Sequence, residues 1–200
     1  MDVNLALGRA KVEVRASIQG QRLALSEEAR AERDAARCAR ILRRLRALRP
    51  RCVAAYVSRE DEPGTLDVLW ELAEAEVEVL LPKMSSGPNA MTSPAWAWWH
   101  GEELTDSVLG IPQPTSPPLA SDALARADVV LVPGLVGTVA GERLGRGGGW
   151  YDRALVFARP EAQRWLLLND SEVLPEVPTE AHDLKVTSII TESRWIDCAQ

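Results

Sequence analysis

The residues best suited to chemistry lie in one short segment, RLGRGGGWYDR, at positions 143–153. Four glycines stand within five positions of this segment, and arginines and one aspartate, Asp152, surround them. Glycine lets a backbone approach a ligand closely, and successive bare amides form a concave anion site. Arginines donate paired hydrogen bonds to phosphate, and a carboxylate is a suitable ligand for Mg²⁺. The segment therefore predicts a phosphate-binding loop beside a metal site.

A simpler alternative is a glycine-rich turn with arginines that face water, which is the usual meaning of a lone GxG pattern. Two well-known phosphate loops do not fit. A Walker A loop has Lys-Ser or Lys-Thr after its last glycine, and no such pair follows Gly149. A dinucleotide-binding loop directly follows its strand, whereas the expected strand at 129–132 is separated from Gly145 by a stretch that starts with Pro133-Gly134.

The elements that must position this loop alternate between helices and strands. A strand, a helix and a second strand in that order predict a parallel pair with a right-handed crossover. We therefore expect one α/β domain over residues 1–200, with three layers, a mostly parallel sheet and the site at the carboxyl ends of its strands. The periodicity predicts helices over 2–20, 26–48, 65–75, 119–127 and 151–157, strands over 52–57, 77–81, 95–99, 129–132, 165–168 and 186–191, and a flexible loop over 134–141. The residues expected directly after strands, at this end of the sheet, are Ser58, Pro133 and Asn169.

The helix predicted over 26–48 carries arginines at three- and four-residue spacing on one side. Ser26 is a suitable N-cap, and acidic residues follow it. The basic side is either a nucleic-acid surface or a solvated face, and we favour the solvated face because acidic residues partly neutralise it and no aromatic residues are interleaved. The basic side comprises Arg30, Arg33, Arg37, Arg40 and Arg44, and the side expected to face the core comprises Ala36, Ala39, Leu42 and Leu45.

Composition limits the class of protein. The net charge of −6 argues against a general nucleic-acid binder, and no run of eighteen apolar residues predicts a transmembrane helix. The N-terminal region lacks the long apolar run of a secretory signal. The three cysteines are widely spaced, so we expect reduced, mostly buried thiols rather than a metal site. We therefore expect a cytoplasmic protein, a monomer, without nucleic-acid or membrane partners.

Six blocks in order along the chain resemble the 5-formyltetrahydrofolate cyclo-ligase family, also called methenyltetrahydrofolate synthetases. The glycine-rich segment, preceded by Val132-Pro-Gly-Leu135 and Gly141, resembles the signature of that family. The other blocks are Lys11-Val-Glu-Val-Arg15, Tyr56-Val-Ser58 with Glu62 and Thr65, Leu81-Pro-Lys83 with Met91, Gly110-Ile-Pro-Gln-Pro114, and His182-Asp183 with Ile189-Ile-Thr-Glu192.

The resemblance implies a fold of the NagB/RpiA/CoA-transferase-like class and a specific enzyme. Members of the family use ATP as co-substrate and Mg²⁺ as cofactor to close 5-formyltetrahydrofolate into 5,10-methenyltetrahydrofolate, with release of ADP and phosphate. The formyl oxygen is phosphorylated first, the nitrogen at position 10 attacks the activated carbon, and phosphate leaves. The protein mainly has to align two anionic substrates, a reduced folate and ATP, and offset the charge in transfer.

The resemblance also implies roles for individual residues. Without it, Lys11 and Arg15 read as solvated charges four residues apart on one helix face, Asp152 as a helix-start acid, and Glu62 and Asp183 as loop acids. Arg146 and Tyr151 are the implied catalytic residues. The implied metal ligands are Asp152 and Asp183. The implied ATP-binding residues are Lys11, Arg15, Arg143, Leu144, Gly145, Arg146, Gly147, Gly148, Gly149, Trp150 and Tyr151, and the implied folate-binding residues are Val57, Glu62, Arg146, Gly147, Gly148, Gly149 and Trp150.

The chain departs from the family pattern at three positions. Trp150 replaces a tyrosine, Gly64 stands where members often have a second acid, and Gln113 stands where many have Glu. We also expect Trp96 and Trp98 on one side of their strand and Trp99 on the other, for core packing or for stacking on a pterin.

Two other kinds of function remain open from the sequence. One is an ATP-dependent ligase or kinase that acts on another anionic small molecule. The other is a non-catalytic protein that binds folate, or that binds nucleic acid through the arginines of the helix over 26–48.

Overall fold

A computed structural model of the chain describes residues 3–84, 93–107, 110–178 and 184–199. Its centre is a seven-stranded sheet in the order β11-β10-β9-β6-β1-β2-β3. The five inner strands are parallel to their neighbours, and β3 and β11 pair antiparallel at the two edges. The predicted mostly parallel sheet is confirmed. Its strands are β1 Cys52–Ala54, β2 Glu78–Pro82, β3 Trp96–Trp99, β6 Val129–Pro133, β9 Gln163–Leu167, β10 Ser188–Ile190 and β11 Trp195–Asp197.

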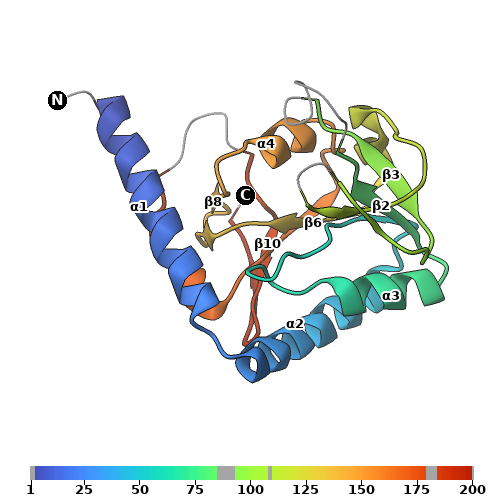
Figure 1. Ribbon diagram of the computed structural model, residues 1–200, viewed down its shortest axis with the longest axis horizontal. Coiled ribbons are helices and arrows are strands. Elements are labelled where there is room, and N and C mark those ends of the chain that lie inside the picture. Colours follow the sequence, from blue (N-terminus) through green and yellow to red (C-terminus); the bar gives the residue numbers. More distant parts are fainter. Residues whose placement is uncertain (1–2, 85–92, 108–109, 179–183, 200) are drawn as a thin grey trace.

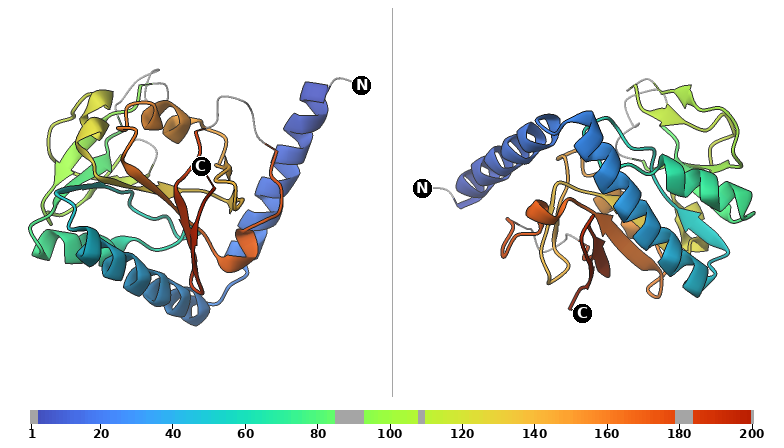
Figure 2. Two further views of the ribbon diagram at one scale, coloured as in Figure 1. Left: turned by 180° about the vertical axis from the view of Figure 1, so that it is seen from behind. Right: turned by 90° about the horizontal axis from the view of Figure 1, so that it is seen from below.

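Helices cover both faces of this sheet, as the three-layer prediction requires (Figure 1). The helices α2 (Glu27–Leu48) and α3 (Leu66–Glu74) lie on one face. The short helix α4 (Trp150–Leu155) and the 3-10 helix η1 (Ser121–Arg126) lie on the other. The first helix, α1 (Val3–Leu23), extends to the side of the body from its junction with α2 (Figure 2).

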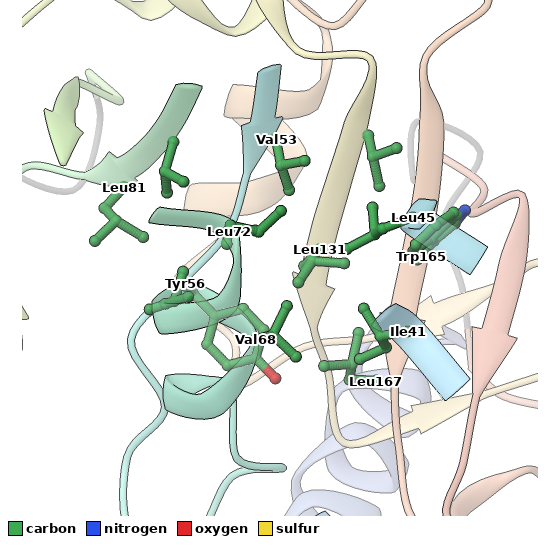
Figure 3. Packing of buried hydrophobic residues seen from close by; sticks show 14 of the residues in the cluster. Ile41, Leu45, Val53, Tyr56, Val68, Leu72, Leu81, Leu131, Trp165 and Leu167 are labelled. Atoms are coloured by element: carbon green, nitrogen blue, oxygen red, sulfur yellow. The ribbon is translucent and has the colours of Figure 1, made fainter. Parts of the chain in front are cut away.

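The larger part of the core lies between the sheet and the pair α2 and α3 (Figure 3). Ile41 of α2 and Val68 of α3 are completely buried, and they pack in one cluster with the sheet residues Leu131, Trp165 and Leu167. The opposite face is closed by a second cluster that includes Trp96, Leu124 and Trp150. Trp99 belongs to the first cluster and Trp96 to the second, so the predicted alternation of side chains along β3 is confirmed.

The sequence of α2 explains where it begins and ends. The Ser26 hydroxyl accepts a hydrogen bond from the amide of Ala29 at 3.2 Å, which confirms the predicted N-cap. The helix ends where Arg49 takes a left-handed conformation, with φ of 51°, just before Pro50. The buried face differs from the prediction, because Ala39 is exposed whereas Cys38 and Ile41 are buried.

The basic side of α2 is not simply a solvated face. Arg37 is fully buried, and its guanidinium donates to the Leu168 carbonyl at 3.1 Å and to Asn169 Oδ1 at 2.9 Å. Arg40 donates to the Ser193 carbonyl at 2.6 Å, and Arg44 lies over the ring of Trp195. The predicted solvated stripe is therefore wrong at its centre, because these arginines bind the segments after β9 and after β10.

The segment 134–141 was predicted as a flexible loop, and part of it is a strand. Here β7 (Val136–Gly137) pairs antiparallel with β8 (Arg143–Leu144). Gly134 and Gly137 allow this arrangement, because a Cβ atom at either position would lie 2.6 Å from the side chain of Leu166. The close approach to β9 holds the backbone in place. A further small hairpin joins β4 (Thr105–Asp106) to β5 (Pro112–Gln113), and η2 spans Asp170–Glu172.

One buried ion pair joins α1 to the body of the protein. Arg22 donates to both carboxylate oxygens of Glu172, at 2.7 and 2.6 Å, and the two side chains are only 3% and 2% exposed. The same guanidinium also donates to the Gly134 carbonyl at 2.8 Å and to the Asp61 carbonyl at 3.2 Å. Arg22 therefore binds the segments that follow β1, β6 and β9.

The three cysteines are free and buried, as expected. Burial, more than the nearby carboxylates, raises the pKa of the Cys52 thiol to about 12 and those of Cys38 and Cys198 to about 11. In the part of the chain that the structure describes, no helix has the length and apolar character needed to cross a bilayer.

We predict that Arg22→Met lowers the free energy of unfolding by roughly 3–5 kcal/mol, because it leaves the Glu172 carboxylate buried without its partner. Urea denaturation followed by circular dichroism measures the loss. The control is Arg46→Met, since Arg46 forms an ion pair with Glu71 in which both side chains are largely exposed, and its loss is worth about 1 kcal/mol or less. Equal effects of the two substitutions would contradict the role assigned to Arg22.

Candidate active site beside the glycine-rich loop

A pocket of about 970 Å³ opens at the carboxyl ends of the central strands. Tyr56 and Val57, which follow β1, line it together with Met84 after β2 and Pro133 and Gly134 around the end of β6. The pocket thus lies at the end of the sheet where the sequence predicted the site. Ser58 and Asn169 do not line the pocket, because their side chains are engaged elsewhere: Ser58 accepts from the amide of Thr65, and Asn169 binds Arg37 and Glu172. The outer wall is apolar and includes Ile111, Pro112, Val156 and Phe157.

The glycine-rich loop, residues 145–149, forms one side of this pocket. It runs from the end of β8 to the start of α4. Gly147 has φ of +100° and Gly149 has φ of +64°, which are conformations that residues with a Cβ atom rarely adopt. These two positions therefore favour glycine, and the backbone of the loop reaches the pocket wall.

Two arginines from outside residues 145–149 hold the loop by its carbonyl groups. Arg15 Nε, from α1, donates to the Gly145 carbonyl at 2.9 Å. Arg153, from α4, donates to the Gly148 carbonyl at 2.6 Å. Lys11 and Arg15 both line the pocket, so the sequence-based expectation that they share a face toward the site fits the structure. Arg153 was not among the predicted site residues, although it is the last residue of the motif that pointed to the site.

Arg143 and Asp152 form an ion pair within the site. Arg143 is 4% exposed at its side chain, and its guanidinium donates to Asp152 Oδ1. Asp152 is 30% exposed and lines the pocket, so one carboxylate is available on the wall. Within the described residues no group of three or more His, Cys, Asp or Glu side chains is arranged to hold a metal. Asp183, the other predicted metal ligand, and His182 lie outside the described residues.

Arg146 is held by two acidic residues from the segment between β1 and α3. Its Nε donates to Glu62 Oε1 at 2.9 Å, and its Nη2 donates to Asp61 Oδ1 at 2.5 Å. Burial would raise the pKa of Asp61, but the hydrogen bond and charge of Arg146 outweigh it, and the pKa lies below its usual value. Sequence reasoning identified Glu62 and Arg146 but not Asp61. The sequence signal that could have identified Asp61 is its position between two other acidic residues, Glu60 and Glu62.

An aromatic cluster supports the start of α4. Trp150 packs edge to face against Trp96 and Tyr151, with ring centroids 5.1 and 4.9 Å apart. The Tyr151 hydroxyl and the Trp150 indole nitrogen are buried and have no hydrogen-bond partner. Burial, reinforced by Tyr56 and Glu62, raises the pKa of Tyr151 well above its usual value, so its hydroxyl stays protonated and keeps its proton to donate.

The other tryptophans near β3 pack in the core and do not line the pocket. Trp96 is completely buried, and Trp98 packs against the second core cluster beneath the guanidinium of Arg126. Core packing is therefore the role that the structure gives to Trp96 and Trp98. Trp150 and Tyr151 are the aromatic residues of α4 that line the site.

Two of the departures from the family pattern, Gly64 and Gln113, each make a local contact. The Gly64 amide donates to Asp34 Oδ1 at 2.9 Å, and a Cβ atom on Gly64 would lie 2.5 Å from Asp34 Oδ2. Asp34 from α2 thus fills the space beside Gly64, and Gly64 is not part of the pocket wall. Gln113 uses its neutral amide oxygen to accept from the Met84 amide at 2.8 Å.

Comparison with known proteins identifies the family. The family model described as "5-formyltetrahydrofolate cyclo-ligase family" matches residues 8–192. The chain belongs to this family. A protein of Mycolicibacterium smegmatis named 5-formyltetrahydrofolate cyclo-ligase is 37% identical over 147 residues, which cover 73% of this chain and 76% of the relative. A protein of Escherichia coli K12 with the same name is 26% identical over 179 residues, which cover 88% of this chain and 97% of the relative.

Solved structures of the family share the fold. The structure of Aquifex aeolicus 5,10-methenyltetrahydrofolate synthetase matches with a TM-score of 0.80 at 24% identity, over 95% of this chain and 93% of that chain. The synthetase from Mycoplasma pneumoniae matches with a TM-score of 0.71 at 18% identity, over 91% and 98% of the two chains. The resemblance inferred from the motif blocks and the expected class of enzyme, a cyclo-ligase, are confirmed.

We predict opposite effects on stability for two glycine substitutions. Gly147→Ala places a Cβ atom in a conformation with φ of +100° and 3.2 Å from the Arg15 guanidinium carbon, so it should lower the free energy of unfolding by roughly 1–3 kcal/mol. Gly20→Ala lies in α1 with no atom within 4 Å of the new Cβ, so it should raise that free energy by roughly 0.5–1 kcal/mol. Thermal and urea unfolding of both variants check the signs, and a stabilising Gly147→Ala would refute the requirement for glycine.

Proposed function

We propose that this protein closes 5-formyltetrahydrofolate into 5,10-methenyltetrahydrofolate in a reaction that consumes ATP and releases ADP and phosphate. Membership of the cyclo-ligase family supports the reaction. The observation that carries it to this chain is the convergence of a positive-φ glycine loop, Arg143, Arg146 and Glu62 on one pocket. The volume of about 970 Å³ lies at the upper end of ligand sites, which suits two substrates at once.

The phosphates of ATP belong beside the glycine-rich loop. Successive backbone amides in such a loop form a concave anion site, and arginines complement the charge. Lys11, Arg15 and Arg143 line the same pocket and bring positive side chains to it, that of Arg143 being paired with Asp152. We therefore assign these side chains, together with residues 144–151, to ATP.

The pterin end of the folate belongs beside Val57 and Glu62. Glu62 is only 10% exposed at its side chain, so its carboxylate is a strong acceptor for the N–H groups at the edge of a pterin ring. Val57 follows β1 and supplies apolar wall next to it. Arg146, Trp150 and the glycines of residues 147–149 then lie between the two substrates, where the formyl group and the terminal phosphate must meet.

In the reaction, the formyl oxygen attacks the γ-phosphorus of ATP, and the bond from that phosphorus to the ADP oxygen breaks. The nitrogen at position 10 then attacks the activated carbon and loses its proton, and phosphate departs with the former formyl oxygen. Arg146 offsets the charge of the phosphoryl group in transfer, which is the main task of a protein in this chemistry. Tyr151, protonated at all working pH values, donates a hydrogen bond toward the reacting oxygens.

The residues present fit a Mg²⁺ ion. The ion commonly binds through one or two carboxylates while substrate phosphates and water fill its other positions. Asp152 offers such a carboxylate on the pocket wall beside the loop, and we assign Asp183 as the second. When bound, Mg²⁺ would neutralise part of the charge of the ATP phosphates.

A coupled assay tests the proposed function directly. We expect purified protein, 5-formyltetrahydrofolate, ATP and Mg²⁺ to produce the absorbance of the methenyl product, with one ADP released per product. Omission of ATP or chelation of Mg²⁺ should abolish the signal. Folate binding with no ATP consumption would instead indicate a storage protein and would overturn the proposal.

We predict that Arg146→Ala lowers kcat by on the order of 10²-fold or more, because it removes the charge that stabilises the phosphoryl group. It should also lower the free energy of unfolding, because it leaves the shielded carboxylates of Asp61 and Glu62 without their partner. Arg46→Ala, which removes an exposed arginine on α2, should retain the activity of the unsubstituted protein. Near-normal turnover by a correctly folded Arg146→Ala protein would show that the assignment is wrong.

Tyr151→Phe should separate activity from stability. The substitution removes a buried hydroxyl without a partner, so the free energy of unfolding should stay the same or increase. The activity should fall by a constant factor between about pH 6 and 9, because the raised pKa of Tyr151 keeps the hydroxyl protonated throughout that range. Initial rates at several pH values measure this factor, and a loss confined to alkaline pH would assign Tyr151 a different role.

We also propose that the protein acts as a cytoplasmic monomer. The three buried free thiols are typical of a reducing compartment, and the net charge of −6 suits a dispersed protein. Sedimentation at several protein concentrations tests the monomer.

A further inference from the structure

The Arg146 side chain cannot bind a phosphate through its Nε–Nη2 edge and keep both of its present partners. Its Nε and Nη2 atoms form the edge that usually grips an oxyanion with two parallel hydrogen bonds, and Glu62 and Asp61 occupy that edge at 2.9 and 2.5 Å. All three side chains are shielded from water, with exposed fractions of 26% for Arg146, 17% for Asp61 and 10% for Glu62. Breaking these ion pairs therefore carries a cost that a nucleotide must offset.

The two acids differ in what can compete for them. In the proposed function, Glu62 is the acceptor for the pterin ring, so folate binding takes one partner from Arg146. Asp61 has no such role, and its backbone carbonyl is held at 3.2 Å by Arg22, which is itself fixed by Glu172. The ion pair between Asp61 and Arg146 is therefore retained whether or not the folate is present.

We propose that Asp61 and Glu62 withhold Arg146 from the nucleotide, and that folate binding at Glu62 strengthens nucleotide binding by releasing one of the two ion pairs. The inference rests on the proposed function and adds a coupling between its two substrates. By linkage, the nucleotide must strengthen folate binding by the same factor. The consequence is that ATP is held most tightly when its acceptor is already in the pocket.

The two acids should have separable effects. Removal of the Asp61 charge lowers the cost of moving Arg146 with and without folate, so nucleotide affinity rises in both states and the coupling is retained. Removal of the Glu62 charge deletes the ion pair that both substrates break, so the coupling disappears. If Asp61 only positioned Arg146 for the phosphate, removal of its charge would weaken nucleotide binding.

The experiment is calorimetric titration of a non-hydrolysable ATP analogue with Mg²⁺, with and without saturating 5-formyltetrahydrofolate. In the unsubstituted protein we expect folate to tighten analogue binding by a factor in the range of about 5–150. Asp61→Asn should tighten analogue binding by about 10-fold both with and without folate, because the substitution removes one hydrogen bond between charged groups. Glu62→Gln should bring the coupling factor to about 1.

The matched control is Glu60→Gln, which removes a negative charge one residue away. The Glu60 side chain is 83% exposed and its ion-pair contact is with Arg30, not Arg146. It should leave analogue affinity within about twofold of the unsubstituted protein, as is typical of an exposed charge. Asp61→Ser serves as a second variant without a carboxylate, and thermal unfolding of each protein confirms that it is folded.

The outcomes separate this inference from the proposed function. A coupling factor of 1 in an unsubstituted protein that forms the methenyl product would overturn the inference and leave the proposed function standing. Weaker analogue binding by a folded Asp61→Asn protein would also overturn it. Failure to form the methenyl product or to bind either substrate would overturn both.

Discussion

The structure depends on one buried arginine that binds three separate segments. Arg22 sits at the end of α1, pairs with Glu172 after β9, and donates to the carbonyl groups of Gly134 after β6 and Asp61 after β1. A guanidinium has five N–H donors in a rigid plane, so it can hold several segments of the backbone at defined angles, which a lysine could not do. Because these segments follow three strands of one sheet, Arg22 sets their relative positions at the edge where the pocket opens. It also anchors the helix that carries Lys11 and Arg15 to that pocket.

In the pocket, arginines are paired with carboxylates. The glycine-rich loop is held in shape from outside by arginines on α1 and α4, whereas Arg146 and Arg143 within the motif are each held by carboxylates. Such pairing reduces the cost of keeping positive charges close together. In the proposed function, binding of an anion would exchange these partners rather than simply add a ligand.

Much of this protein was predictable from its sequence because the signals were local. The apolar runs around residues 53, 79 and 130 and the Ser26 cap depend on near neighbours. They predicted the α/β fold and the carboxyl edge of the sheet as the position of the site. The glycine motif at 145–149 predicted a tightly turned loop for the same reason, since φ near +100° at Gly147 is a conformation that residues with a Cβ atom rarely adopt. The ordered motif blocks identified the family, and the family model confirmed it.

What the sequence alone determined is therefore the main helices, the inner strands of the sheet and the family. What only the tertiary structure decided is which charged groups meet. Arginines at regular spacing on α2 look solvated until the segments after β9 and β10 pack on Arg37 and Arg40. From the sequence, Gly64 is only the absence of an acidic residue that relatives often have, whereas the structure shows that Asp34 occupies the space beside it. Asp61 gains its partner only because Arg146, far away in the sequence, folds against it. The physical reason is that propensity acts over a few residues, whereas an ion pair is created by burial and proximity that the whole fold provides.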